Sequence, residues 1–446
     1  MVIDPAVAGV DPDHALGLGR LLLDQMEVSS ASTVIVAPPG ALPPALPPGD
    51  LLMRFSGRRE GDALSLRAEW IAAGKLEAGG AWKACETPVT TPSEAFRRLE
   101  EGMPMASLHP GAGSLLPADA PAFWELARQV SIQEDVAAEA DLEASSKLAE
   151  SAPGSAAAWV NLGEHVYRNL WTQPASSDLP QVRALQAFDR ALALVPGYPR
   201  AAFLKGMLLT DVGDERTALR TLAAARALRP GVPDFYSGLA YAGRASGLLE
   251  GALRALAARD GLTRPYRIQE GWFAENTYLY SGRWEEFRRS LRKSHDPFFL
   301  FYEGYLDLAQ GRRDEALPLF EEGAADRRTS IPFSDLCGVY ALALEGRQDE
   351  ALAKLKSFEE ARGRLRIPDG ELTFKVAEAY AFLGRPEDAV TVAGRAFAQG
   401  FGCLAWYERS PLFAAAHQSP RWAGLREHIR ERQALLEETF PPGTFG

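Results

Sequence analysis

A position that favours alanine recurs along the last two-thirds of this 446-residue chain. Six of its occurrences are alanines and one is a phenylalanine: Ala184, Ala218, Ala252, Phe287, Ala316, Ala351 and Ala389. By subtraction of these numbers, successive positions lie 34, 34, 35, 29, 35 and 38 residues apart. A period of about 34 residues is typical of helical hairpins that stack because one hairpin cannot bury its apolar face alone. A short side chain here lets the second helix of each hairpin lie close to the first.

The sequence around this position resembles the tetratricopeptide repeat. The first recognisable unit has the family's order of tryptophan, leucine, glycine, alanine, aromatic, alanine and proline, at Trp159, Leu162, Gly163, Ala184, Phe188, Ala191 and Pro196. Residues 171–179 are an insertion of about nine residues relative to the usual repeat. Later units keep a turn glycine between their helices, at Gly282, Gly311, Gly346 and Gly384, where a tight turn needs backbone freedom. The resemblance covers residues 157–398 and implies a right-handed tetratricopeptide α-solenoid.

The first 105 residues lack this repeat and predict a small α/β domain. Residues 12–26 predict an amphipathic helix, and the β-branched run from Ser32 to Ala37 predicts a buried strand. Two runs between Leu51 and Ile71 flank a Glu-Gly-Asp turn, which indicates a β-hairpin. Residues 79–85 supply a candidate third strand, and Thr91 precedes a proline-led helix.

This order of elements resembles the TolB amino-terminal-like domain. The matching segments are Phe55-Ser56-Gly57-Arg58-Arg59, Leu64-Ser65-Leu66 and Gly80-Ala81-Trp82. The family's first strand would precede the first helix, where this sequence offers only Val2-Ile3-Asp4, so that strand is either degenerate or lost. In relatives, this domain and the repeats often follow a protein kinase, cyclase or winged-helix module, and this sequence contains none of the three.

The remaining segments connect or cap these regions. Residues 106–121 are a linker by composition, and residues 122–156 are expected to form a degenerate repeat or an N-terminal cap. Residues 399–446 are expected to be capping helices and a tail. The fold class is therefore mainly α, a tetratricopeptide solenoid preceded by a small α/β domain.

Composition limits the partner and the compartment. The formal net charge of −11 argues against nucleic acid as a partner, which favours a basic surface. Cys85, Cys337 and Cys403 are too few and too far apart for a disulfide framework or a Cys-x-x-Cys metal site, so we expect buried thiols in a reducing compartment. No apolar stretch has the length of a membrane span, and the first residues lack the pattern of a signal peptide. We therefore expect a cytoplasmic protein without a membrane span.

The sequence contains no recognisable catalytic motif. None of the six histidines (His14, His109, His165, His295, His417 and His428) has metal-ligand spacing or lies in a nucleophile motif. Phosphate-binding loops, nucleophile elbows and kinase catalytic loops are also absent from the sequence. The chain is predicted not to be an enzyme, with no catalytic residue, no cofactor and no metal.

Partner binding is instead predicted on the concave face, which the first helix of each repeat lines. The inward positions, counted back from the alanine position, are Phe203, Tyr241, Trp272, Asn276, Phe301, Tyr305, Tyr340 and Phe374. An aromatic groove of this kind suits an extended peptide or a partner helix. The alternative is that several of these side chains are ordinary core residues. Only Asn161 and Asn276 could contribute to the carboxylate clamp of one tetratricopeptide subgroup, so we do not expect that clamp.

Two functions from different classes follow. The first is a non-catalytic scaffold or regulatory adaptor that binds a protein or peptide in the concave groove. The second is the sensory half of a split signalling system, whose N-terminal domain binds a small molecule or nucleotide and whose repeats contact a separately encoded kinase or cyclase. A third, envelope assembly, would need a secretion signal. The sequence leaves the identity of the partner and homo-oligomerisation open.

Overall fold

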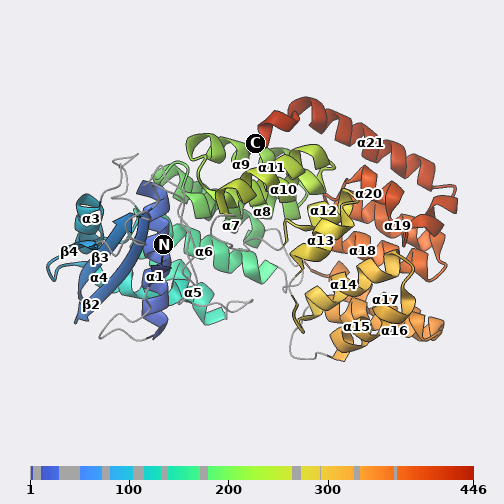
Figure 1. The fold of residues 1–446 in the computed structure, drawn as a ribbon, viewed down its shortest axis with the longest axis horizontal. Helices are drawn as coiled ribbons and strands as arrows, with labels where there is room; N and C mark the ends of the chain where they lie inside the picture. The colour runs from blue at the N-terminus through green and yellow to red at the C-terminus, as the bar shows by residue number, and fades with distance from the viewer. Residues whose placement is uncertain are drawn as a thin grey trace. The chain divides into compact units, whose positions relative to one another are not determined.

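The computed structural model describes residues 2–3, 12–29, 51–72, 81–103, 115–131, 139–170, 179–263, 273–291, 293–325, 332–365 and 369–446. This part of the chain is mainly helical, with one small sheet near its start, which confirms the predicted fold class (Figure 1). The chain divides into two compact units. Unit 1 consists of residues 1–206, 221–236 and 257–270, and unit 2 of residues 207–220, 237–256 and 271–446. The predicted strand from Ser32 to Ala37 lies outside the described residues.

Unit 1 begins with a sheet whose strands lie in the spatial order β1-β2-β3-β4. These strands are β1 (Val2–Ile3), β2 (Leu51–Glu60), β3 (Ala63–Ala72) and β4 (Lys83–Glu86). β1 pairs in parallel with β2, and the other neighbours are antiparallel. The β2–β3 hairpin turns at Gly61, whose φ of 62° is the positive value that tight hairpin turns need. The predicted hairpin is confirmed, and the candidate third strand, predicted over residues 79–85, is found at Lys83–Glu86.

Three helices pack together beside this sheet: α1 (Pro12–Ser29), α3 (Pro92–Gly102) and α4 (Ala120–Val130). α3 packs on β3, and Phe96 of α3 meets Phe123 of α4 with ring centres 5.5 Å apart. α1 crosses α4 so closely that a Cβ at Gly17 would lie 1.7 Å from the carbonyl oxygen of Ala127. Glycine at position 17 is therefore required for this helix packing.

The end of the predicted linker is an ordered part of unit 1. Leu115 is buried, and its carbonyl oxygen accepts hydrogen bonds from the Ser155 hydroxyl at 2.9 Å and the Ala157 amide at 2.9 Å. These bonds attach Leu115 to the start of α6. α5 (Glu139–Ser151) lies between α4 and α6 in the sequence and packs against both. The composition of this segment predicted a linker, but composition could not predict the hydrogen bonds that the Leu115 carbonyl accepts.

Seven helical hairpins follow within the described residues. Their pairs are α6 (Ala156–Leu170) with α7 (Leu179–Leu194), α8 (Pro199–Asp211) with α9 (Glu215–Leu228), α10 (Pro233–Ala245) with α11 (Leu249–Thr263), α12 (Asn276–Tyr280) with α13 (Trp284–Ser290), α14 (Pro297–Ala309) with α15 (Arg313–Ala325), α16 (Pro332–Leu344) with α17 (Gln348–Gly363), and α18 (Gly370–Phe382) with α19 (Pro386–Ala398). The recurring alanine or phenylalanine lies in the second helix of every pair and is fully buried in all seven. The division between the two units falls within α8, α9, α10 and α11.

One irregularity of the sequence pattern has a local explanation. The spacing of 29 residues after Phe287 coincides with α13, which has only 7 residues, so the next hairpin begins earlier. The turn glycines Gly282, Gly311, Gly346 and Gly384 have φ values of 76°, 79°, 79° and 70°, as predicted for tight turns between helices.

Unit 2 ends with α20 (Leu404–Arg409), the 3₁₀ helix η3 (Ala414–Gln418), α21 (Trp422–Thr439) and the 3₁₀ helix η4 (Pro442–Thr444). This end of the unit returns to the unit's first helices. The Gly402 amide donates to the Ala245 carbonyl at 2.7 Å, and a Cβ at Gly400 would lie 2.7 Å from the Cα of Gly213. The repeats of unit 2 therefore close on themselves.

We expect Gly17→Ala to destabilise unit 1 by about 1–3 kcal/mol, because the backbone of α4 cannot move aside as a side chain could. Alanine gains up to about 1 kcal/mol over glycine in a helix, so the steric cost opposes an intrinsic gain. The measurement is the thermal midpoint of the full chain. Gly394→Ala in α19 is the control, since a Cβ there meets nothing within 4 Å and should not lower the midpoint. An unchanged midpoint for Gly17→Ala would contradict the close crossing of α1 and α4.

Candidate functional site

A cluster of buried charged and aromatic side chains lies inside unit 2, around α18. This helix begins at Asp369, whose carboxylate accepts from the Glu371 amide at 2.9 Å although its own φ is 57°. The charged residues Glu371, Lys375 and Glu378 follow at intervals of four and three residues. Because an α-helix turns once in about 3.6 residues, this spacing places all three on one face of α18.

The Glu371 carboxylate is held by side chains from α10 and α12. Arg244 donates through Nη2 at 2.6 Å and through Nε at 3.2 Å to one carboxylate oxygen. Asn276 Nδ2 at 2.8 Å and the Tyr280 hydroxyl at 2.7 Å donate to the other oxygen. Glu371 and Arg244 are both buried. This cluster connects helices that lie 127 residues apart in the sequence.

The Glu378 carboxylate is fully buried about two turns beyond Glu371 on α18. One of its oxygens accepts from the Tyr305 hydroxyl at 2.6 Å, the Trp406 indole at 3.0 Å and the Ser410 hydroxyl at 2.5 Å. The other accepts from Lys375 Nζ at 3.0 Å. Side chains of α14, α18 and α20 and of the residue that follows α20 thus meet at one carboxylate.

Aromatic rings surround the ammonium group of Lys375. Its Nζ lies 4.0 Å from the ring centre of Tyr305, 5.1 Å from that of Tyr280 and 5.4 Å from that of Trp406. The face of an aromatic ring attracts a cation, most strongly where water is excluded. Lys375 has no exposed surface. The rings and Glu378 together replace the water that this charge has lost.

Burial and pairing act in opposite directions on the charged groups. Burial raises the pKa of Glu371, but the charge of Arg244 and the hydrogen bonds from Tyr280, Arg244 and Asn276 outweigh it, so the pKa lies below the ordinary value. Burial lowers the pKa of Lys375, and the attraction of Glu378 offsets only part of this effect. Both carboxylates have their oxygens occupied by donors from the protein itself. This network is suited to holding helices together, and a buried group already engaged in this way is poorly placed to act on a substrate.

Most of the residues predicted to line a partner groove lie in or around this network. Tyr241, Asn276, Phe301, Tyr305, Tyr340 and Phe374 are all buried in unit 2. Tyr241 donates to Asp211 at 2.6 Å, and Phe301 packs against Tyr305 and Tyr340. Phe374 faces the end of the unit, where its ring centre lies 4.1 Å from that of Tyr407. These six side chains therefore line no open groove in the structure.

The other two predicted groove residues differ from these six. Phe203 lies in unit 1 and is half-buried, whereas Trp272 lies outside the described residues. The alternative stated from the sequence, that such residues belong to the core, describes the six buried side chains. The physical reason is that α18 and α20 fill the inner face of unit 2 with their own polar and aromatic side chains.

Sequence reasoning missed the charged members of this network: Arg244, Glu371, Lys375, Glu378 and, as their aromatic partner, Trp406. One signal was available. α18 is otherwise strongly apolar, and three charged residues on one face of an apolar helix indicate a buried ionic contact. Nothing in the sequence indicated that Arg244 and Trp406 would be the partners.

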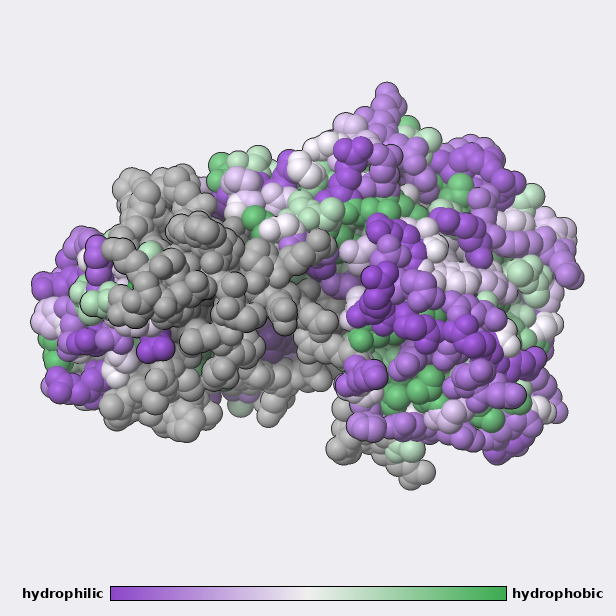
Figure 2. All heavy atoms as spheres, in the orientation of Figure 1, coloured by the Kyte–Doolittle hydropathy of each residue, from purple (hydrophilic) through white to green (hydrophobic). Residues whose placement is uncertain are grey.

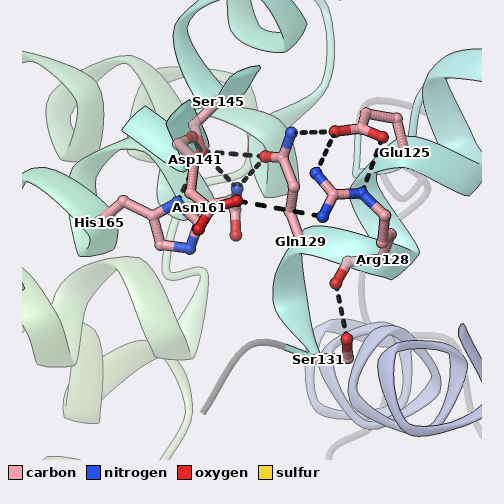
Figure 3. A network of polar contacts seen from close by, with 8 residues as sticks. All are labelled: Glu125, Arg128, Gln129, Ser131, Asp141, Ser145, Asn161 and His165. Atoms are coloured by element: carbon pink, nitrogen blue, oxygen red, sulfur yellow. Dashed lines mark hydrogen bonds and ion pairs between the residues drawn. The ribbon is translucent and has the colours of Figure 1, made fainter. Parts of the chain in front are cut away.

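A second polar network joins α4, α5 and α6 of unit 1 (Figure 3). The side-chain oxygen of Gln129 accepts from Asn161 Nδ2 at 2.7 Å and from the Ser145 hydroxyl at 2.9 Å. The Gln129 amide group donates to Glu125 at 2.6 Å. Gln129, Ser145 and Asn161 are buried. The network therefore satisfies most of its buried polar groups, although the side-chain oxygen of Asn161 accepts no hydrogen bond from the described residues.

This network brings a serine hydroxyl next to a histidine ring, which the sequence did not indicate. Ser145 Oγ lies 2.6 Å from Nδ1 of His165 (Figure 3), and burial lowers the pKa of His165. A serine beside a histidine is the first requirement of a nucleophile activated by a base. However, Ser145 is fully buried and also contacts Gln129 and the Asp141 carbonyl. The pair is therefore part of the packing between α5 and α6.

A third cluster attaches α1 to the repeats within unit 1. Asp24 of α1 accepts from the Tyr198 hydroxyl at 2.6 Å and forms an ion pair with Arg200 at 3.4 Å. Arg200 also pairs with Glu164, which is bound by Arg168 at 2.6 Å.

The C-terminal end of α1 is held by a further arginine. Arg229 Nη1 donates to the Val28 carbonyl at 2.5 Å and to the Glu27 carbonyl at 3.2 Å. Its Nε donates to the Gly197 carbonyl at 3.0 Å. A cation at this end of a helix also complements the helix dipole. The α/β domain and the first repeats are thus connected by buried charges.

Within the described ranges, no three His, Cys, Asp or Glu side chains come together as a metal site would require. In the same ranges, no helix combines the length and apolarity needed to cross a membrane. Comparison of the chain with known protein families and with curated protein sequences found no match.

We expect Glu371→Ala to destabilise unit 2 by about 3–5 kcal/mol, because it leaves the buried guanidinium of Arg244 without its charged partner. The measurement is urea unfolding followed by circular dichroism. The control is Glu350→Ala, which breaks an exposed pair with Arg347 and should change stability little. Equal effects of the two substitutions would show that the network does not hold unit 2 together.

The pH dependence of stability should reveal Glu164. Burial raises its pKa, but Arg200, Arg168 and Arg20 outweigh burial and lower it from 4.5 to about 2. A carboxyl group whose pKa is depressed in the folded state stabilises the fold above its unfolded pKa of 4.5. This stabilisation is lost as the pH falls towards 2. Stability of the natural chain should therefore fall more steeply than that of Glu164→Gln between about pH 5 and pH 2.5, by up to about 3 kcal/mol. Parallel pH profiles in urea unfolding would contradict this.

Proposed function

We propose that the chain is a non-catalytic interaction protein, a tetratricopeptide-like scaffold or regulatory adaptor that binds another protein. The observation that carries this proposal is the internal pairing of the charged groups at the centre of unit 2. Glu371 is paired with Arg244, and Lys375 is paired with Glu378, as expected of groups that fix a rigid scaffold. Stacked helical hairpins offer large surfaces for recognition, and their rigidity lowers the entropy lost on binding.

The filled inner face changes where a partner would bind. With Phe301, Tyr305 and Tyr340 fully buried, a partner would contact the outer faces and turns of the repeats. The turns of unit 2 carry exposed charged residues of both signs after each turn glycine, such as Arg347 with Glu350 and Arg385 with Asp388. Hydrophilic residues also predominate on the face of unit 2 seen in Figure 2. Such a surface favours a partner recognised by complementary charge.

The second candidate function is a sensor, in which a ligand of the N-terminal domain alters what the repeats bind. Its support is the attachment of α1 to Tyr198, Arg200 and Arg229. α1 packs against α4 as well, so a shift of α1 would also move α4. A cytoplasmic location, and a kinase or cyclase as the partner, remain parts of this proposal.

Chemical crosslinking of the full chain in native lysate, read by mass spectrometry, tests the proposal. We expect a stoichiometric protein partner crosslinked through the exposed Lys356 of α17 and never through the buried Lys375 of α18. Crosslinks at Lys375 would mean that the inner face opens to the partner. Crosslinks that change when nucleotides are added would favour the sensor. Absence of any stoichiometric partner would contradict both functions.

A further inference from the structure

α18 begins at an aspartate whose backbone conformation usually requires glycine. Asp369 has a φ of 57° and is the only residue other than glycine with a positive φ in the part of the chain that the structure describes. Aspartate tolerates this region because its short carboxylate can hydrogen-bond to the nearby backbone. Here the carboxylate accepts from the amides of Glu371 at 2.9 Å and Leu372 at 3.4 Å, and the Asp369 carbonyl accepts from the Thr373 amide at 2.8 Å. Asp369 therefore fixes the first turn of α18.

This turn also places two carboxylates close together. Glu371 follows Asp369 by two residues and is buried in the network that holds unit 2. Its oxygens accept hydrogen bonds from side chains, including the guanidinium of Arg244 at 2.6 Å. Asp369 accepts only the two backbone hydrogen bonds among the described residues. Of two neighbouring carboxylates, the one without a hydrogen-bonded cation is the one whose charge is more costly.

The groups that face Asp369 from other helices do not remove this cost. Arg362, in the last turn of α17, is buried and attracts Asp369, but its Nη2 has no hydrogen-bond partner among the described residues. Tyr302 of α14 stays neutral, because burial raises its pKa well above 10. Burial and the charge of Glu371 raise the pKa of Asp369 from 3.8 to about 6, although Arg362 and the hydrogen bonds from the backbone oppose this shift.

We propose that Asp369 is a proton-responsive cap, and that uptake of one proton by its carboxyl group strengthens the closure of unit 2 around α18. With Asp369 neutral, Glu371 keeps its bonds to Arg244 without a second negative charge in the same turn. The first turn of α18 then needs to bury one charge fewer. This inference goes beyond a scaffold of fixed stability, because mild acid would tighten the unit and neutral pH would loosen it.

The direction of the effect follows from linkage between proton binding and folding. A carboxyl group whose folded pKa is raised binds its proton more tightly in the folded chain than in the unfolded one. The stability that it contributes is fully present below the unfolded pKa of 3.8 and is lost as the pH rises through about 6. Between about pH 5 and pH 7.5, this residue alone should raise the unfolding equilibrium constant by about tenfold.

The full-length variant Asp369→Asn tests the proposal. Asparagine keeps an oxygen for the two amides and tolerates a positive φ, but it has no proton to exchange. Urea unfolding followed by circular dichroism gives the stability at about pH 5 and about pH 7.5. Between these values, the unfolding constant of the natural chain should rise about tenfold more than that of the variant.

The matched control is Asp388→Asn in the first turn of α19, where an exposed carboxylate pairs with Arg385. Its pH profile should follow that of the natural chain. Parallel profiles of the natural chain and Asp369→Asn would overturn the proposal.

A measurement on the natural chain decides the matter if Asp369→Asn does not fold. The carboxyl carbon of Asp369, followed by nuclear magnetic resonance as the pH is changed, reports the protonation of this group directly. We expect a midpoint above about pH 5, whereas an ordinary aspartate titrates near pH 4. A midpoint at or below about pH 5 would overturn the proposal.

Discussion

The pairing of two buried carboxylates on α18 is the constraint on which unit 2 depends. Removing an ion from water costs several kcal/mol in a protein, and only well-placed partners offset this cost. Glu371 takes its partners from α10 and α12, and Glu378 takes its partners from α14, from α18 itself and from the α20 region. These helices come from different hairpins, so the two carboxylates can both be satisfied only when the hairpins close around α18. Apolar packing alone would permit several nearby arrangements, whereas directed bonds to a buried charge do not.

This constraint also determines which surfaces are available for function. An inner face that carries aromatic residues at regular spacing is a binding groove when it is open and a hydrophobic core when it is closed. In unit 2, α18 brings two carboxylates and the ammonium group of Lys375 to the tyrosines and the tryptophan. The aromatic side chains then act as hydrogen-bond donors and as a cage for Lys375. Under the proposed function, a partner protein would consequently meet the charged turns and the outer helices.

Unit 1 shows the same principle at the border between two kinds of fold. The α/β domain and the first repeats share a unit because α1 carries a buried carboxylate and ends where Arg229 can bind its last carbonyls. Gly17 permits the close crossing of α1 and α4, and Leu115 anchors the end of the preceding segment on α6. Each of these contacts joins residues that are distant in sequence. A boundary inferred from composition marks a change of pattern, but it does not show that two regions lack contacts.

The sequence by itself determined the helical hairpins, their turns and the β-hairpin. These features depend on local rules: a short residue where helices cross, a glycine where φ is positive, and alternation where one face of a strand is buried. The position of Ala316 or Gly346 therefore predicts its structure without knowledge of any distant residue. The tertiary structure alone decided that Phe301, Tyr305 and Tyr340 are core residues, that Arg244 is the partner of Glu371, and that Phe445 packs against Gly243 and Gly251. Burial and ion pairing are properties of the space between distant segments, and closure of the repeats creates that space.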